Sequence, residues 1–251
     1  MITFHESNLK RAVKNLFLQP NPSKVVLEFH LGLGDNLVCI ALVRELVARE
    51  PSTTFYYPCP QSSFHTIAWI YRDLRNLFPI PIQNGREIRQ LVGFLNARHV
   101  LVGVRDVDIK RFDAFFYEQH GVPFDSRWRN SYVDPGSAAE DLFQKLNPSS
   151  EPYLLICSRQ SGNIDHQLRI NNPAQKKCIY VEPLTTNLYD WMKLTLHADE
   201  IHTIDTSFVH FVENVLSHCT SKPSLFYHLI RPSQTEFTRR LPWNVVPYVW
   251  E

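Results

Sequence analysis

The sequence predicts an α/β protein made of two halves, each built on a parallel sheet, that face a central cleft. Apolar or β-branched runs alternate with helical patterns about every 25 residues, which is typical of parallel strands joined by helices. This alternation pauses at residues 147–152 (NPSSEP), a stretch rich in turn-forming residues, and then starts again. We therefore expect an N-terminal domain at residues 1–148 and a C-terminal domain at residues 149–251.

The N-terminal half is expected to begin with a polar lead-in helix before its first strand. Its strands are predicted at residues 25–30, 53–57, 77–82 and 99–104. Its helices are predicted at residues 37–47, 61–74, 86–97, 111–120 and 137–146. Three local signals add detail: the prolines at 79 and 81 suit a strand end or a sheet edge, Gly121 ends a helix, and Ser137 with Glu140 forms a capping box. Residues 121–134 show no regular pattern.

The C-terminal half repeats the same order of elements. Strands are predicted at residues 153–157, 178–181, 201–204 and 224–229, and helices at residues 186–197 and 207–216. A polar loop at residues 158–170 separates the first strand from the second. The tail ends in VVPYVW, which is either an edge strand or a segment packed across the domains.

Composition excludes several classes of protein. The 251 residues carry a net charge of +1 with no long run of one sign, so no general attraction to nucleic acid or a membrane surface is expected. No stretch reaches the roughly 18 apolar residues of a membrane span, and no signal architecture opens the chain. The five cysteines are scattered without a CxxC pair, which indicates buried, reduced thiols. We expect a soluble cytoplasmic protein of undetermined oligomeric state.

The most informative stretch is the glycine turn at residues 30–36 (HLGLGDN), between the first strand and its helix. Glycines allow a ligand to approach the backbone, and a helix N-terminus favours negative charge. Leu37 stands where a dinucleotide fingerprint would have its third glycine, so a dinucleotide site is not the first interpretation. Asp35 either caps the helix or faces the cleft as a base. The acceptor-side candidates are His30, Gly32, Gly34 and Asn36.

A second candidate site lies where the strand at residues 201–204 gives way to a helix. Asp205, Thr206 and Ser207 place hydroxyl and backbone N–H groups where they could bind a phosphate or a diphosphate. His210 follows one turn later and could face the same ligand. Alone, this pattern is more typical of an ordinary helix cap, and a lone helical histidine more typical of packing.

Further candidates follow the first two strands of the C-terminal half. Arg159 and Arg169 could pair with phosphate oxygens, and Ser161 with Gly162 could bring backbone N–H groups close to them. Glu182 stands at the carboxyl end of a strand, where open sheets bind ligands, and could hold sugar hydroxyls or cap the next helix.

Other enzyme classes lack their motifs in this sequence. It contains no GxSxG nucleophile elbow, no P-loop and no HExxH. The eleven histidines are dispersed, so neither a metal site nor a bound cofactor is expected.

The segments HLGLGD and EIHTIDTSFVHFVE resemble GT-B-type glycosyltransferases distantly related to the ADP-heptose:lipopolysaccharide heptosyltransferases. YEQHGVPFDSRW and LFYHLIRP resemble smaller members of this group, so the likeness covers about residues 24–232. It implies a compact GT-B-like pair of Rossmann-like halves. Two features depart from the family: Phe208 stands where it has a glycine after its Asp-[ST] pair, and the chain is short.

The resemblance assigns roles to individual residues. Asp35 matches the catalytic base, and Thr206, Ser207 and His210 match the helix at the donor phosphates. Arg159 or Arg169 lies near the basic residue that neutralises the leaving diphosphate, and Glu182 near the ligand of the donor ribose. The implied partners are a nucleotide-sugar donor and a glycan or glycolipid acceptor, with inversion and without a metal.

Two other functions are compatible with parts of these patterns. A non-catalytic protein that binds a nucleotide-sugar or a glycan would keep the same fold and the same phosphate helix. A sugar-nucleotide epimerase would need a dinucleotide fingerprint and a YxxxK pair, and the sequence has neither.

Overall fold

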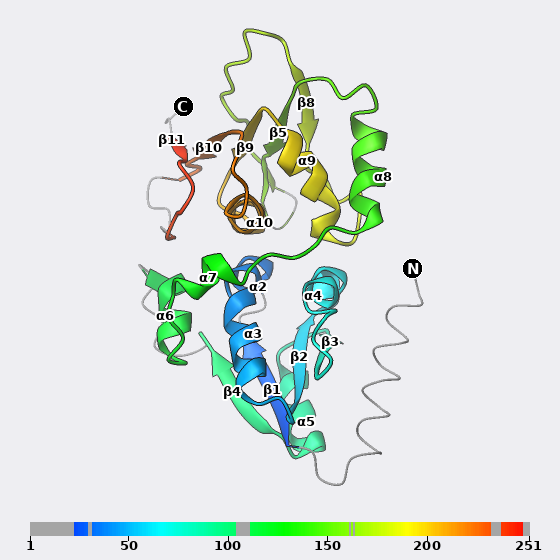
Figure 1. The fold of residues 1–251 in the computed structure, drawn as a ribbon, viewed down its shortest axis with the longest axis vertical. Coiled ribbons are helices and arrows are strands. Elements are labelled where there is room, and N and C mark those ends of the chain that lie inside the picture. Colours follow the sequence, from blue (N-terminus) through cyan, green and yellow to red (C-terminus); the bar gives the residue numbers. More distant parts are fainter. Residues whose placement is uncertain are drawn as a thin grey trace.

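The computed structural model describes residues 23–29, 32–103, 111–160, 162, 164–231 and 237–247. Figure 1 shows two α/β units stacked on one another, with helices α2 (Leu33–Val38) and α10 (Ser207–Leu216) lying where the units meet. The expected α/β class, with a parallel sheet in each half, is confirmed. The predicted lead-in helix and His30 lie outside the described residues.

The first sheet has four parallel strands in the order β3-β2-β1-β4. They are β1 (Lys24–Phe29), β2 (Thr54–Pro60), β3 (Leu77–Ile82) and β4 (Arg98–Val102). The accompanying helices are α2, α3 (Ile40–Arg49), a short 3-10 turn (Gln61–Ser63), α4 (Phe64–Ile70) and α5 (Arg86–Leu95). The edge position predicted for the proline-containing strand β3 is confirmed. The helix expected after the glycine turn is two helices, because the backbone of Cys39, with φ −90° and ψ 8°, is not helical.

Three helices follow the first sheet: α6 (Phe112–Glu118), α7 (Ser126–Arg129) and α8 (Ser137–Leu146). Helix α7 lies in the stretch for which no regular structure was expected. Gly121 ends α6 as predicted: its φ is +58°, and its amide and that of Val122 donate hydrogen bonds back to the carbonyls of Glu118 and Tyr117. The predicted capping box is wrong: Gly136 is the N-cap of α8, and the Glu140 carboxylate accepts hydrogen bonds from Gln144 and Lys193.

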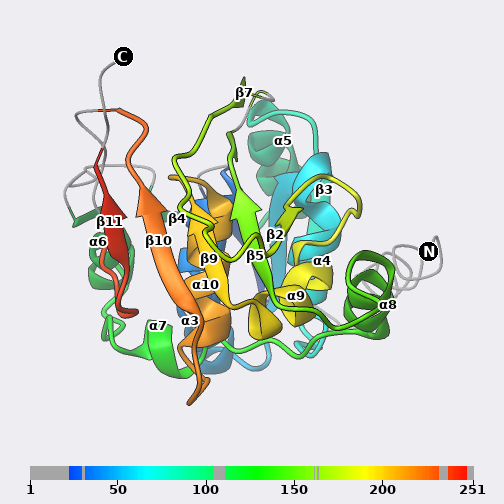
Figure 2. The ribbon, with the colours of Figure 1, turned by 90° about the horizontal axis from the view of Figure 1, so that it is seen from above.

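The second sheet has five parallel strands in the order β11-β10-β9-β5-β8. They are β5 (Tyr153–Cys157), β8 (Lys177–Tyr180), β9 (Glu200–Thr203), β10 (Ser224–His228) and β11 (Asn244–Val246). Figure 2, which looks onto this unit, shows β11 at the edge beyond β10, as expected for the tail. The remaining elements are the hairpin β6 (Arg159–Gln160) and β7 (Ile164–Asp165), a 3-10 turn (Leu188–Trp191), α9 (Met192–His197) and α10.

One hydrophobic core runs through both units. The same cluster contains Phe29 and Leu37 from the first unit and Leu155 and Phe211 from the second. Across the contact between α2 and α10, the buried Asn214 side chain donates a 2.8 Å hydrogen bond to the Leu37 carbonyl. The units are therefore fixed to one another by buried packing at this contact, while the exact domain limits near residue 148 stay a prediction.

Two further expectations concern the burial of the cysteines and the length of the apolar helices. Cys39, Cys59 and Cys157 are buried free thiols, but Cys178 is exposed on the edge strand β8 and Cys219 is half-buried, so the expectation of five buried thiols is wrong. Among the described residues, no helix is both long and apolar enough to cross a membrane.

Candidate active site

The predicted site residues follow the strands that flank the point where each sheet reverses its order. This reversal falls between β1 and β4 in the first sheet and between β5 and β9 in the second. In open parallel sheets, ligands bind beyond the carboxyl ends of the strands at such a point. The glycine turn follows β1, Arg159 follows β5, and Asp205 follows β9. Sequence and topology therefore select the same edge of each sheet.

The glycine turn is held in shape by the buried Asn36. Its side-chain amide donates a 2.6 Å hydrogen bond to the Gly32 carbonyl, and its oxygen accepts a hydrogen bond from the Tyr57 hydroxyl. Because Asn36 is buried and these bonds engage both ends of its amide, the side chain orients the turn.

Asp35 lies in the first turn of α2 and is partly exposed. Its carboxylate is near the Gly32 backbone, since a Cβ added to Gly32 would lie 3.0 Å from Asp35 Oδ2. The N-cap is Gly32, so Asp35 is not the residue that caps the helix. Its charge is favoured there by the helix dipole.

The helix cap expected at the second candidate site is confirmed. Thr206 is the N-cap of α10, and its Oγ1 accepts a 3.2 Å hydrogen bond from the Phe208 amide. Ser207, the first residue of the helix, is partly exposed. Asp205 lies 3.2 Å from Arg231; burial raises the pKa of Asp205, and the arginine opposes that shift. The N-terminus of α10, which is the positive end of its dipole, thus lies next to a guanidinium.

The two stretches meet at Gly34. A Cβ added to this glycine would lie 3.2 Å from His210 Cδ2 and 3.7 Å from the Ser207 Cα. Gly34 thus lets the first turn of α2 pack directly on the first turns of α10. The base candidate and the phosphate-helix candidate, far apart in the chain, therefore lie in adjoining helical turns.

We expect Gly34→Ala to weaken this contact. A carbon 3.2 Å from the His210 ring forces the ring or the helix to shift, at an expected cost of about 1–3 kcal/mol in the free energy of unfolding. Chemical denaturation measures this cost. Gly85→Ala is the matched control, because an added Cβ there meets nothing within 4 Å and should leave stability within about 0.5 kcal/mol. Equal costs for the two variants would contradict the close approach at Gly34.

His210 is buried in the interior and has a packing role, which is the more typical role of a lone helical histidine. Its ring lies edge-on to the rings of Phe112 and Phe237, with centroids 6.3 Å and 4.8 Å away. Burial, together with the nearby positive charge of Arg127, lowers the pKa of His210 to about 3. The imidazole is therefore neutral at pH 7 and brings no positive charge to a phosphate.

This depressed pKa predicts a pH dependence of stability. Below the ordinary histidine pKa of about 6.5, the unfolded chain takes up a proton at His210 that the folded chain does not bind until about pH 3. Folding stability should fall as the pH falls from 6.5, by roughly 1 kcal/mol per pH unit from this residue. His210→Gln should remove this part of the slope, whereas His197→Gln, at an exposed position, should not. An unchanged slope in His210→Gln would contradict the assignment.

The remaining predicted donor residues lie in exposed loops at the same edge. Arg159 forms a bidentate ion pair with Asp165, at 2.9 and 3.1 Å, within the β6–β7 hairpin. This pairing raises the pKa of Arg159. Gly162 has a φ of +85°, so the hairpin turn itself accounts for a glycine there. Arg169 and Glu182 are exposed. Ser161 lies outside the described residues.

Sequence reasoning missed Arg231 and the buried pair of Arg127 with Asp113. Arg231 follows β10, so the rule that selected Glu182 at a strand's carboxyl end would also have selected it. The Arg127–Asp113 pair, at 2.9 Å, is fully buried. Asp113 lies in a predicted helix, but Arg127 comes from a stretch without a regular pattern, so nothing in the sequence indicated that the two would pair. Among the described residues, no group of three or more His, Cys, Asp or Glu side chains is arranged to hold a metal ion.

The fold is similar to those of solved glycosyltransferases. A glycosyl transferase family 9 protein from Veillonella parvula matches with a TM-score of 0.58 and 11% identity, over 93% of this chain and 89% of its own. The E. coli ADP-heptose lps heptosyltransferase II matches with a TM-score of 0.53 and 12% identity, over 89% and 90%. No family model matches the sequence, and no curated protein is detectably similar to it. The heptosyltransferase-like GT-B fold is thereby confirmed.

Proposed function

We propose that this protein is a glycosyltransferase that moves a sugar from a nucleotide-sugar to a hydroxyl group of a glycan or glycolipid. The observation that carries the proposal is the contact at Gly34. Through it, the turn of α2 that carries the partly exposed Asp35 packs on the first turns of α10, whose N-cap is Thr206. A base beside a diphosphate site is what transfer from a nucleotide-sugar requires. The likeness to glycosyltransferases in fold supports the same class.

In this proposal Asp35 acts as the general base. Its carboxylate takes the proton from the acceptor hydroxyl, and the oxygen attacks the anomeric carbon of the donor. The bond from that carbon to the diphosphate oxygen breaks, and the nucleoside diphosphate leaves with the bonding electrons. Attack on the face opposite the leaving group inverts the anomeric centre.

The departing diphosphate needs positive charge, which this chain can supply by itself. Helix α10 has ten residues, and its N-terminus brings the positive end of its dipole to this edge. Arg231 lies beside it, paired to Asp205, and Arg159 follows the neighbouring strand β5. We therefore propose that transfer requires no metal ion, and Glu182 after β8 is the proposed ligand of the donor ribose.

Binding of a nucleotide without a metal is the first test of this proposal. Nucleoside diphosphates and nucleotide-sugars should raise the melting temperature, because a ligand that binds only the folded state stabilises it. One base should bind in preference to the others, and EDTA should leave the shift unchanged. Thermal unfolding followed by calorimetry measures both effects. Stabilisation that EDTA abolishes would contradict the metal-free proposal, and no binding at millimolar concentration would contradict the donor site.

A non-catalytic nucleotide-sugar or glycan-binding protein is the second candidate function. It is favoured by the pairing of both arginines at this edge, since Arg159 and Arg231 each bind a carboxylate of the chain itself. A protein of this kind would bind the nucleotide but release no sugar, and Asp35 would be dispensable for its binding.

A further inference from the structure

We propose that a pocket between α7 and residues 238–240 binds a phosphate-bearing ligand, separately from the donor site. The pocket has a volume of about 430 Å³. It is lined by Asp125, Trp128, Arg129, Thr238, Arg239 and Arg240. None of these residues belongs to the candidate active site, and the inference does not depend on glycosyl transfer.

The pocket carries an excess of positive charge. Three arginines line it and only one carboxylate, that of Asp125. Among the described residues, no carboxylate pairs with Arg129, Arg239 or Arg240; the contacts of the last two are with the rings of Tyr227 and Trp128, 5.7 and 6.0 Å away. Three unneutralised guanidiniums around one hollow repel each other unless an anion lies between them.

A second pocket does not have this excess of positive charge. It is larger, about 710 Å³, and shares Arg129 with the first. Its three arginines are matched by three carboxylates, and Arg44 pairs directly with Asp73. The side chains lining the larger pocket therefore carry no net charge, whereas those lining the smaller pocket carry a net positive charge that attracts an anion.

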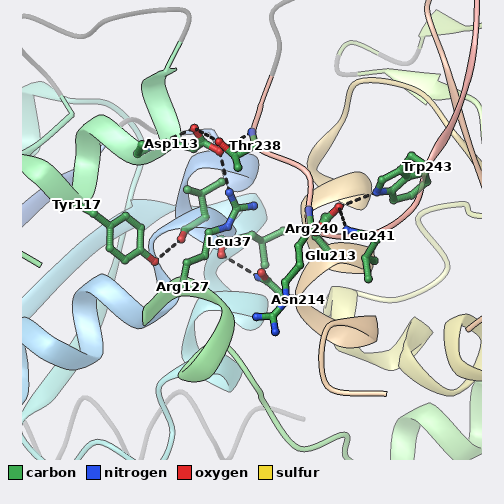
Figure 3. Close-up of polar contacts among 12 residues, drawn as sticks. Leu37, Asp113, Tyr117, Arg127, Glu213, Asn214, Thr238, Arg240, Leu241 and Trp243 are labelled. Atoms are coloured by element: carbon green, nitrogen blue, oxygen red, sulfur yellow. Dashed lines mark hydrogen bonds and ion pairs between the residues drawn. The ribbon is translucent and has the colours of Figure 1, made fainter. Parts of the chain in front are cut away.

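Buried contacts hold the wall of the pocket in place. Figure 3 shows Arg127 and Thr238 converging on Asp113: the Thr238 amide donates to its carboxylate at 2.8 Å, and the Arg127 guanidinium at 2.9 Å. The Arg127 guanidinium also lies 4.2 Å from the centre of the Trp128 ring. Asp113 is thus fully engaged beneath the pocket, and the pocket arginines project from an ordered backbone.

The neighbouring backbone is held by α10. The buried Glu213 accepts hydrogen bonds from the amides of Arg240 and Leu241, at 3.2 and 3.3 Å, and from the Trp243 indole at 2.7 Å. Glu213 is six residues beyond Ser207, about 9 Å along the helix. The Arg240 side of the pocket therefore lies beside the later turns of α10, whereas the donor phosphates are proposed at its N-terminus.

The size and the side chains indicate the class of ligand. A volume of about 430 Å³ exceeds one phosphate and is in the range of small-molecule sites. Guanidiniums bind phosphate oxygens in pairs, so a diphosphate, a sugar phosphate or a phospholipid headgroup shares the required chemistry. Because Arg129 comes from the connection after the first sheet and the other two arginines from the tail, a bound anion would also join these segments.

Titration with inorganic pyrophosphate at constant ionic strength tests the proposal. We expect the Arg239→Gln/Arg240→Gln double variant to lose about tenfold or more in affinity, since hydrogen bonds to charged groups are strong. Arg89→Gln, at an exposed arginine of α5, should leave this binding unchanged. The comparison is made in an Arg159→Gln background, which weakens any binding of pyrophosphate at the donor edge. Asp125→Asn should tighten it. Equal loss in Arg89→Gln, or full binding by the double variant, would overturn the proposal.

Two further binding experiments distinguish a soluble phosphate from a phospholipid headgroup. One uses glucose 6-phosphate in solution, and the other uses phosphatidylcholine vesicles with and without phosphatidylglycerol. Binding in one experiment that the double variant loses supports the site and identifies its source. Binding in neither experiment, or binding that the double variant keeps, would overturn a phosphate site. The substituted side chains are exposed, so unchanged thermal unfolding without anion confirms that the double variant is folded.

Discussion

Asp35→Asn should reduce sugar transfer about 10²- to 10⁴-fold while nucleotide affinity stays nearly the same. The loss has the size expected when a general base is removed, because the amide cannot accept the acceptor's proton. Affinity is kept because the proposed donor contacts lie at α10, Arg231 and Glu182, outside the glycine turn. Asn is nearly the same size, so the turn held by Asn36 should keep its shape. Product formation and calorimetric binding measure the two effects separately.

The matched control for this variant is Asp141→Asn. Asp141 is an exposed carboxylate in α8, and we expect its replacement to leave transfer unchanged. An Asp35→Asn protein that keeps its activity would contradict the base assignment. A variant that also loses nucleotide binding would assign Asp35 to the donor site instead.

Asp113→Ala should destabilise the fold by about 3–5 kcal/mol. Removing one partner of a fully buried ion pair leaves the other charge without compensation, and Arg127 is buried completely. The variant also removes the acceptor for the Thr238 amide, which ties the tail to the first half of the chain. Denaturant unfolding measures the loss, and Asp113→Asn provides a milder form if the alanine variant does not fold.

The control for the buried pair is an exposed one. Asp73→Ala breaks the pair with Arg44 at a surface position, where water screens the charges, and should cost less than about 1 kcal/mol. Similar costs for Asp113→Ala and Asp73→Ala would show that burial does not set the energy of the Arg127 pair.

Most of the fold could be predicted from the sequence because its strands are short apolar runs with clear turn signals. All eight strands predicted before the tail form, and the proline-containing one lies at an edge. Local patterns failed where packing decides the outcome. No turn-forming residue in the sequence marks the break between α2 and α3 at Cys39. Helix α7 contains the buried Arg127, whose partner lies outside the local sequence.

The candidate site could be predicted in part, for the same reason. Motif spacing selected Asp35 and Thr206, but the contact that joins their helices depends on Gly34 fitting against His210, which no local pattern contains. The pairing of Arg159 with Asp165 depends on hairpin register and was not foreseen. His210 matched a family motif, yet its burial between two aromatic rings gives it a packing role.

The most direct test of the central claim is detection of the transferred sugar. The protein would be incubated with each nucleotide-sugar that binds, together with glycan and glycolipid acceptors and EDTA. Mass spectrometry would follow the acceptor and the released nucleoside diphosphate. The account predicts an acceptor heavier by one sugar and an equal amount of nucleoside diphosphate, both lost in Asp35→Asn. Tight nucleotide binding without product for any donor would contradict a transferase and favour a binding protein.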